Sequence, residues 1–372
     1  MLALVLGRWS AWTGCVLAMH SLNSLQTLRA LAAWMVVVHH YMQIVHGFNH
    51  ASWAGHFFSE VGGFAVEVFF VISGFIMHFS LTQKHSNGLE FFVKRLIRIV
   101  PAYWMATLAF VLVVAWLPSA WTPSGAWTWS TLAQSLLFLP HQNPTGLGLY
   151  PTLTVGWSLN FEVFFYGLLT GALALLKRGW FLTTVLVLLV LPWVWSPAWT
   201  GAAIFGSGLI RLFAFGMLLS SLFVCRSKAQ DHEGGWQRRF ALLLALTACV
   251  ACLLGRPLPL LWRVEPLLMQ FLACALVWTF VINETWIRRW PGAMRWRQLG
   301  DASYSTYLLH TVARFFLLGI IPADSDWSLQ AWFFMAYLLL TAALSHLSFR
   351  VVETGSAMRW LQSRLLAKIA KD

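Results

Sequence analysis

Ten apolar stretches, each close in length to the hydrocarbon core of a bilayer, follow one another along the chain with polar segments between them. A helix needs about 20 predominantly apolar residues to cross that core. The pattern therefore predicts ten transmembrane helices, near residues 25–45, 57–81, 99–118, 152–176, 179–195, 203–224, 239–255, 264–283, 302–321 and 329–350. No connecting segment is long enough for a soluble domain, so we expect one all-α integral membrane domain.

The distribution of Lys and Arg sets the expected orientation, because cytoplasmic loops of membrane proteins carry an excess of both residues. With the N-terminus inside, 19 of the 25 Lys and Arg residues fall in the inner loops and the tail, whereas the outer loops hold only Arg256 and Arg263. Arg211 and Arg314 fall within expected spans. Both termini are therefore predicted to be cytoplasmic.

The same patterns divide the chain into three regions. Residues 1–21 are interpreted as an N-terminal extension that lacks the basic start of a signal peptide, with Met19 as an alternative start. Residues 22–352 form the predicted transmembrane domain. Residues 353–372 form a basic cytoplasmic tail.

Composition agrees with a membrane location. Hydrophobic residues make up 59% of the chain and charged residues 10%, whereas soluble domains carry about 25% charged residues. The net charge of +12 follows from the orientation signal, so the expected partner is the lipid bilayer and not nucleic acid. Cys249 and Cys252 form a CxxC pair inside an apolar run without a second His or Cys pair, so no metal site is expected.

The segment TLRALAAWMVVVHHYMQIV, residues 27–45, places Arg29 near one end of an expected helix and His39 and His40 near its middle. Ionisable residues inside a bilayer are costly and often functional. At 100° per residue, Arg29 and His40 share one face, about 16 Å apart along the axis, and His39 points about 100° away. Two interpretations stay open: Arg29 reaches the headgroups while the histidines bond to neighbouring helices, or these residues belong to a polar site.

Two further spans contain a carboxylate, Glu67 and Glu162, and Ser73 lies in the same span as Glu67. A carboxylate beside a histidine builds a general base, because it fixes the tautomer and stabilises the imidazolium. On a chain with so few charges, these residues indicate one polar site, and a base at His40 would be oriented by Glu67 or Glu162. The alternative for each acid alone is a structural hydrogen bond.

Arg95 and Arg98 lie one helical turn apart in KRLIRIVPAYW, at the inner start of the third span. Anchoring at the inner membrane surface accounts for such a pair. The functional alternative is a phosphate clamp, because the guanidinium fork matches phosphate oxygens. A cytosolic ligand that carries phosphates would then meet Arg29, Arg95 and Arg98 at the same face of the membrane.

Five ordered segments resemble the motifs of acyltransferase family 3, the integral-membrane O-acyltransferases, and most closely its exopolysaccharide and O-antigen acetyltransferase subgroup. The resemblance covers about residues 22–350. It places Glu67 where Asp is commoner, and Glu162 and His310 at the family's later acid and histidine. The segments are LRALAAWMVVVHH, FAVEVFFVISGFIM, VKRLIRIVPAYW, VGWSLNFEVFFY and LGDASYSTYLLH.

The resemblance implies a bacterial inner-membrane enzyme with cytosolic acetyl-CoA as acyl donor, no permanently bound cofactor and a carbohydrate hydroxyl as acceptor. His40, Glu67 and Glu162 would be catalytic, and Arg29, Arg95 and Arg98 would bind the CoA phosphates. His310, His39 and Ser73 are further candidates. The chain departs from the family at Val163 and Ala214, where many members carry acids, so Arg211 is left out of the catalytic set.

Several alternatives stay open at this point. His40 either takes a proton from the acceptor hydroxyl or is itself acetylated and passes the group on. The acceptor is either a glycan or another molecule, and buried His and Glu also suit a proton-coupled transporter. The outer loop 119–151, with Trp121, Trp127 and Trp129, is either an interfacial aromatic belt or a glycan platform, and part of it could dip back into the membrane.

Overall fold

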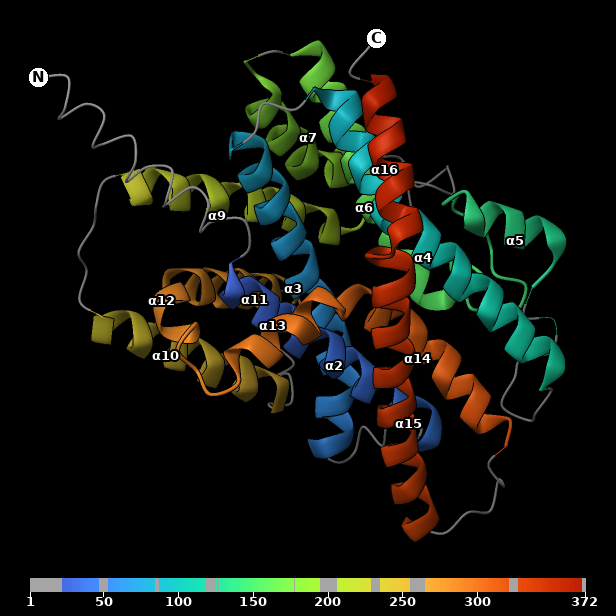
Figure 1. Ribbon diagram of the computed structural model, residues 1–372. Helices are drawn as coiled ribbons and strands as arrows, with labels where there is room; N and C mark the ends of the chain where they lie inside the picture. Colours follow the sequence, from blue (N-terminus) through green and yellow to red (C-terminus); the bar gives the residue numbers. More distant parts are fainter. Residues whose placement is uncertain are drawn as a thin grey trace, which may run out of the picture.

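A computed structural model describes residues 22–46, 53–83, 87–117, 125, 127–176, 178–194, 206–228, 235–254, 265–320 and 327–369, and every regular element in them is helical (Figure 1). The longer helices are α2 (Asn23–His46), α3 (Trp53–Gln83), α4 (Gly88–Trp116), α6 (Trp157–Leu175), α7 (Trp180–Val194), α9 (Arg211–Lys228), α10 (Gly235–Leu254), α11 (Glu265–Ile282), α14 (Ser303–Leu318) and α15 (Trp327–Ser348). The shorter elements are α5 (Trp129–Leu136), α12 (Glu284–Ile287), α13 (Ala293–Asp301), α16 (Ser356–Ile369), the 3-10 turns η1 (Thr154–Gly156) and η2 (Gly208–Ile210), and the π-helical turn η3 (Phe349–Glu353).

Each of the ten apolar segments predicted from the sequence overlaps a helix in the structure. Six helical stretches of the described residues are long and apolar enough to cross a membrane, so the chain is a multi-pass membrane protein. They are Ala54–Gln83, Gly88–Trp116, Thr154–Leu175, Gly208–Arg226, Gly235–Leu254 and Ser328–Ala367. The count of ten crossings and the cytoplasmic position of the termini stay predictions. The extension 1–21 lies outside the described residues, and most of the predicted tail forms α16.

Helix α4 begins eleven residues earlier than the apolar pattern indicates. Asn87 caps it by accepting a hydrogen bond from the backbone N–H of Glu90 at 2.8 Å, and Glu90 places a negative charge in the first turn. Pro101 lies inside the helix and has no N–H for the carbonyl four residues earlier. Tyr304 of α14 donates to the carbonyl of Ile99 at 2.7 Å, so it ties the two helices together beside this proline.

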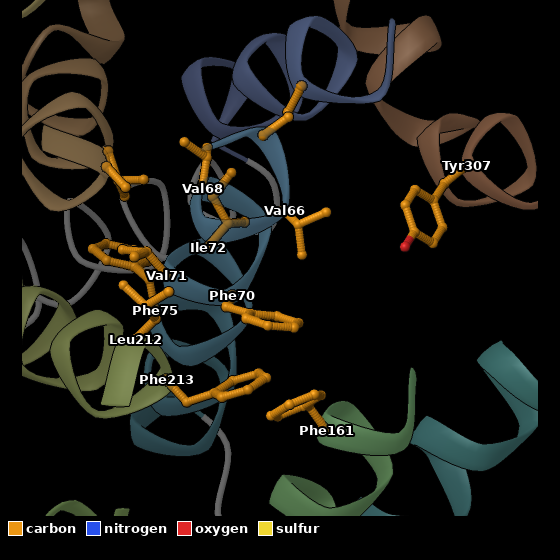
Figure 2. Packing of buried hydrophobic residues seen from close by; sticks show 14 of the residues in the cluster. Val66, Val68, Phe70, Val71, Ile72, Phe75, Phe161, Leu212, Phe213 and Tyr307 are labelled. Atoms are coloured by element: carbon orange, nitrogen blue, oxygen red, sulfur yellow. The ribbon is translucent and has the colours of Figure 1, made fainter. Parts of the chain in front are cut away.

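The backbones of α3 and α9 touch through glycine. A Cβ atom at Gly74 would lie 2.1 Å from the carbonyl oxygen of Phe213, and one at Gly216 would lie 2.1 Å from that of Val71. Small residues allow such close helix approach in membranes. Phenylalanine rings then fill the space beside the contact: Phe70 packs on Phe213 with centroids 4.8 Å apart (Figure 2). This contact fixes the position of α3, which forms one wall of the site.

Helix α14 is buried and carries many polar side chains. Fourteen of its 16 residues are buried, and it packs against α2, α4 and α15, beside which it runs in Figure 1. Its polar side chains recur every three or four residues and so form one stripe along the helix. The stripe consists of Ser303, Tyr304, Tyr307, His310, Thr311 and Arg314.

The segment between α4 and α6 packs beside the middle of α4. The indole Nε1 of Trp104 donates to the carbonyl of Leu136 at 2.8 Å, and the Tyr103 ring lies 4.9 Å from that of Phe138. A Cβ atom at Gly156 would lie 2.6 Å from the Tyr103 ring. Helix α6 therefore begins near the level of Tyr103 and not at the C-terminal end of α4. This arrangement agrees with a segment that turns back into the membrane.

Candidate functional site

A cavity lies between α2, α3, α4, α6 and α14 and holds about 790 Å³ of empty space, part of it open to solvent. Five of the sequence-predicted residues line it: Arg29, Ser73, Arg95, Arg98 and Glu162. The structure therefore brings together side chains from four helices that are far apart in the sequence.

Glu162 is held firmly in this cavity. Its carboxylate accepts a hydrogen bond from Ser73 Oγ at 2.8 Å and another from the Tyr166 hydroxyl at 3.1 Å. It also lies close enough to Arg29 and Arg95 to interact with them electrostatically. Glu162 therefore orients neighbouring side chains and offsets part of the positive charge of the arginines.

The three arginines of the cavity form no ion pair within 4.0 Å with any carboxylate among the described residues. Arg29 donates to Gln26 Oε1 at 3.2 Å, and Arg95 donates to Ser80 Oγ at 3.3 Å while its Nε has no partner. Arg98 is exposed. Three guanidinium groups with unused N–H donors make this end of the cavity suitable for an anion with several oxygens.

A second hollow adjoins the first and shares Arg95 and Arg98 with it. Its other walls include Lys94, Asp301 and Glu353, together with residues of α16. Burial raises the pKa of the Asp301 carboxyl above its ordinary value, against the opposite effect of nearby arginines. Glu353 accepts a hydrogen bond from Ser305; in the sequence it is only the first residue of the polar tail, so no pattern singles it out. The two arginines thus lie at the passage between both hollows.

The histidines form a separate cluster. The rings of His40 and His310 stack with centroids 5.2 Å apart, and His39 meets His40 edge-on at 4.8 Å. His310 is fully buried, whereas His40 Nδ1 lies 3.0 Å from Oε1 of the exposed Gln43. An amide oxygen only accepts, so this contact places a proton on Nδ1 and leaves a lone pair on Nε2 of His40.

Gln43 therefore occupies the position in which the sequence predicted a carboxylate. Neither Glu67 nor Glu162 is among the described hydrogen-bond, ring or electrostatic neighbours of His40. Glu67 lies near Cys274 of α11, its Oε2 has no hydrogen-bond partner, and it does not line the cavity. Helix α3 turns Ser73 to the cavity and Glu67 toward other helices, and the hydrogen-bond partner of the His40 ring is a neutral amide.

Tyr307 connects the cavity to the histidine cluster. Its side chain lines the cavity opposite Val66 and Phe70 of α3, and Figure 2 shows these side chains on either side of the same space. The Tyr307 ring lies 6.1 Å from that of His310, and its hydroxyl donates to the carbonyl of Val155 at 2.8 Å. A ligand anchored at the arginines can therefore extend along Tyr307 toward the histidines.

Comparison with known proteins identifies the class to which this fold and site belong. The family model that describes the acyltransferase domain matches residues 22–350 of this chain. The chain therefore belongs to acyltransferase family 3, as its ordered motifs predict. Over 285 residues it is 32% identical to the exopolysaccharide production protein ExoZ of Rhizobium meliloti (strain 1021). The aligned region covers 72% of this chain and 80% of that relative. No solved structure matches.

Proposed function

We propose that this membrane acyltransferase moves an acetyl group from cytosolic acetyl-CoA to a hydroxyl of an exported carbohydrate. The observation that carries the proposal is the cavity that begins at Arg29, Arg95 and Arg98 and reaches Tyr307, next to the stacked histidines. The name of the relative from Rhizobium meliloti supports an exopolysaccharide as acceptor. A bacterial inner membrane is the matching location.

The donor fits the cavity chemically. The phosphates of CoA would contact the three arginines, which have no carboxylate within ion-pair distance among the described residues. The pantetheine arm is narrower and less charged, and it would follow the largely apolar wall that includes Val66, Phe69 and Ile72. This placement directs the thioester toward Tyr307 and His310.

The chemical step requires a base for the acceptor hydroxyl, and His40 is suited to it. Its Nε2 lone pair takes the proton while the acceptor oxygen attacks the thioester carbonyl carbon. The tetrahedral intermediate then collapses, the carbon–sulfur bond breaks, and the CoA sulfur leaves with the proton from the imidazolium. The products are an O-acetyl ester and free CoA. Gln43 holds the base in the required tautomer, and its exposure favours entry of the acceptor from that side.

The test uses purified full-length protein in lipid nanodiscs with acetyl-CoA labelled in the acetyl group. Transfer of label to added exopolysaccharide, with release of one CoA per acetyl group, is the expected result. His40→Ala should lose transfer, whereas His346→Ala, at an exposed position in the last turn of α15, should retain it. Label that never leaves CoA with any acceptor, together with proton flux in proteoliposomes, would favour the transporter alternative.

A further inference from the structure

Arg314 is a buried cation in the histidine cluster. It lies one turn beyond His310 on the polar stripe of α14 and is 6% exposed. Its Nη1 donates to the carbonyl oxygen of His40 at 3.2 Å, and its guanidinium lies 4.7 Å from the centroid of the Phe315 ring. Its Nε is buried and has no hydrogen-bond partner. The side chain thus reaches the backbone of the residue proposed above as the base, and it still has an unused donor.

No carboxylate of the described residues lies within ion-pair distance of Arg314. Its electrostatic neighbours are the Tyr337 hydroxyl and the three histidines. A buried charge without a counter-ion is costly, and inside a membrane protein it usually has a function. A single bond to a helix carbonyl does not require an arginine, because a neutral donor would tie α14 to α2 at lower cost.

The other donors close to the histidines are already in use. The hydroxyl of Tyr307 donates to the carbonyl of Val155, and that of Tyr337 donates to the carbonyl of Val37. His39 Nδ1 lies 2.6 Å from the carbonyl of Phe58. Among the described neighbours of His40, the Arg314 guanidinium is therefore the group best able to meet a new negative charge.

We propose that Arg314 is a catalytic residue that stabilises the oxyanion of the tetrahedral intermediate, an inference that rests on the function proposed above. When the acceptor oxygen bonds to the thioester carbon, the carbonyl π electrons move to its oxygen, and the hydroxyl proton moves to His40. The oxyanion then lies beside the Arg314 guanidinium. When the carbonyl re-forms, the carbon–sulfur bond breaks and the CoA sulfur takes the proton, so no other reactant is needed.

The test compares Arg314→Ala and Arg314→Lys with wild type in the acetyl-transfer assay. Loss of an oxyanion donor lowers kcat by about 10²–10³-fold. We therefore expect that loss in Arg314→Ala, with the dissociation constant of acetyl-CoA changed less than twofold. Added guanidinium ion at millimolar concentration should restore part of the kcat of Arg314→Ala but none of that of His40→Ala.

Arg211→Ala is the matched control. Arg211 also has a buried Nε without a partner, but it lies on α9 against the Trp193 ring, and we expect wild-type kcat without any response to guanidinium. If Arg314→Ala does not fold, Arg314→Lys and Arg314→Gln decide, because lysine keeps the charge and has N–H donors, whereas glutamine keeps only neutral donors. A kcat of Arg314→Lys within threefold of wild type, together with a loss of at least tenfold in Arg314→Gln, supports the charge role. Wild-type kcat in folded Arg314→Ala or Arg314→Gln overturns the inference while leaving the proposed transfer intact.

Discussion

The imidazole rings of His40 and His310 stack with their centroids 5.2 Å apart and their planes inclined by 18°, although their positions in the chain differ by 270 residues. The contact joins α2, which carries Arg29 at the other end of the same face, to α14, which carries Tyr307 and Arg314. The pair therefore lies beside the polar stripe of α14, and Tyr307 of that stripe, which lines the cavity, is 6.1 Å from His310.

This stacking predicts different roles for the two histidines. His40→Ala removes the proposed base and should lower kcat by about 10²–10⁴-fold. His310→Phe keeps a ring against His40 and should stay within about threefold of wild type, whereas His310→Ala loses a contact of about 0.5–1.5 kcal/mol and up to about tenfold in kcat. Steady-state kinetics on folded variants measures all three. A His310→Phe variant as inactive as His40→Ala would give His310 a chemical role of its own.

Gln43 should matter through the tautomer of His40. Gln43→Leu removes the amide oxygen that accepts from Nδ1, so part of the population would carry the proton on Nε2 and be unable to act as a base. We expect a decrease in kcat of about tenfold, the equivalent of about 1.4 kcal/mol, with no change in acetyl-CoA affinity. Gln83→Leu, an exposed glutamine at the end of α3, is the control. Equal activities of the two variants would contradict the orienting role.

The arginines of the cavity should act on donor binding. Arg98→Ala removes a charge that would contact the CoA phosphates, and we expect the KM for acetyl-CoA to rise by about tenfold or more, as a charge-assisted hydrogen bond of about 1.5–3 kcal/mol implies. The kcat at saturation should change little. Arg178→Ala, an exposed cation outside both hollows, should leave both constants unchanged. A fall in kcat alone would rule out the phosphate role of Arg98.

The fold was largely predictable because helix length and apolar content are properties of consecutive residues. The ten predicted segments all contain helices, but the charged first turns of α4 and the short α5, α13 and α16 were missed, since their apolar residues are too few to stand out. The 3-10 turns η1 and η2, which lead into α6 and α9, lie inside the predicted spans and were not distinguished from them.

The site was predictable only in part. Arg29, Arg95, Arg98 and Glu162 stand out in the sequence as charges in or beside apolar segments, and the structure places all four on one cavity. The partner of His40 could not be predicted, because it depends on which helices meet and how each is rotated. Gln43 is an uncharged residue near a helix end and carries no sequence signal. Arg314 did stand out as a charge within a span, but its role depends on α14 packing against α2.

The close contact of α3 and α9 gives a prediction about stability. Gly74→Ala would place a Cβ atom 2.1 Å from the carbonyl oxygen of Phe213, and backbone cannot yield as a flexible side chain can. Forcing an extra methyl group into a packed interior costs about 1–3 kcal/mol or more, so we expect a lower midpoint of thermal unfolding in detergent. Gly63→Ala on the same helix meets no atom within 4 Å and should match or slightly exceed wild type, because alanine favours the helix. If both variants unfold at the wild-type temperature, α3 and α9 cannot be as close as their glycines indicate, and the cavity wall formed by α3 would have to be placed differently.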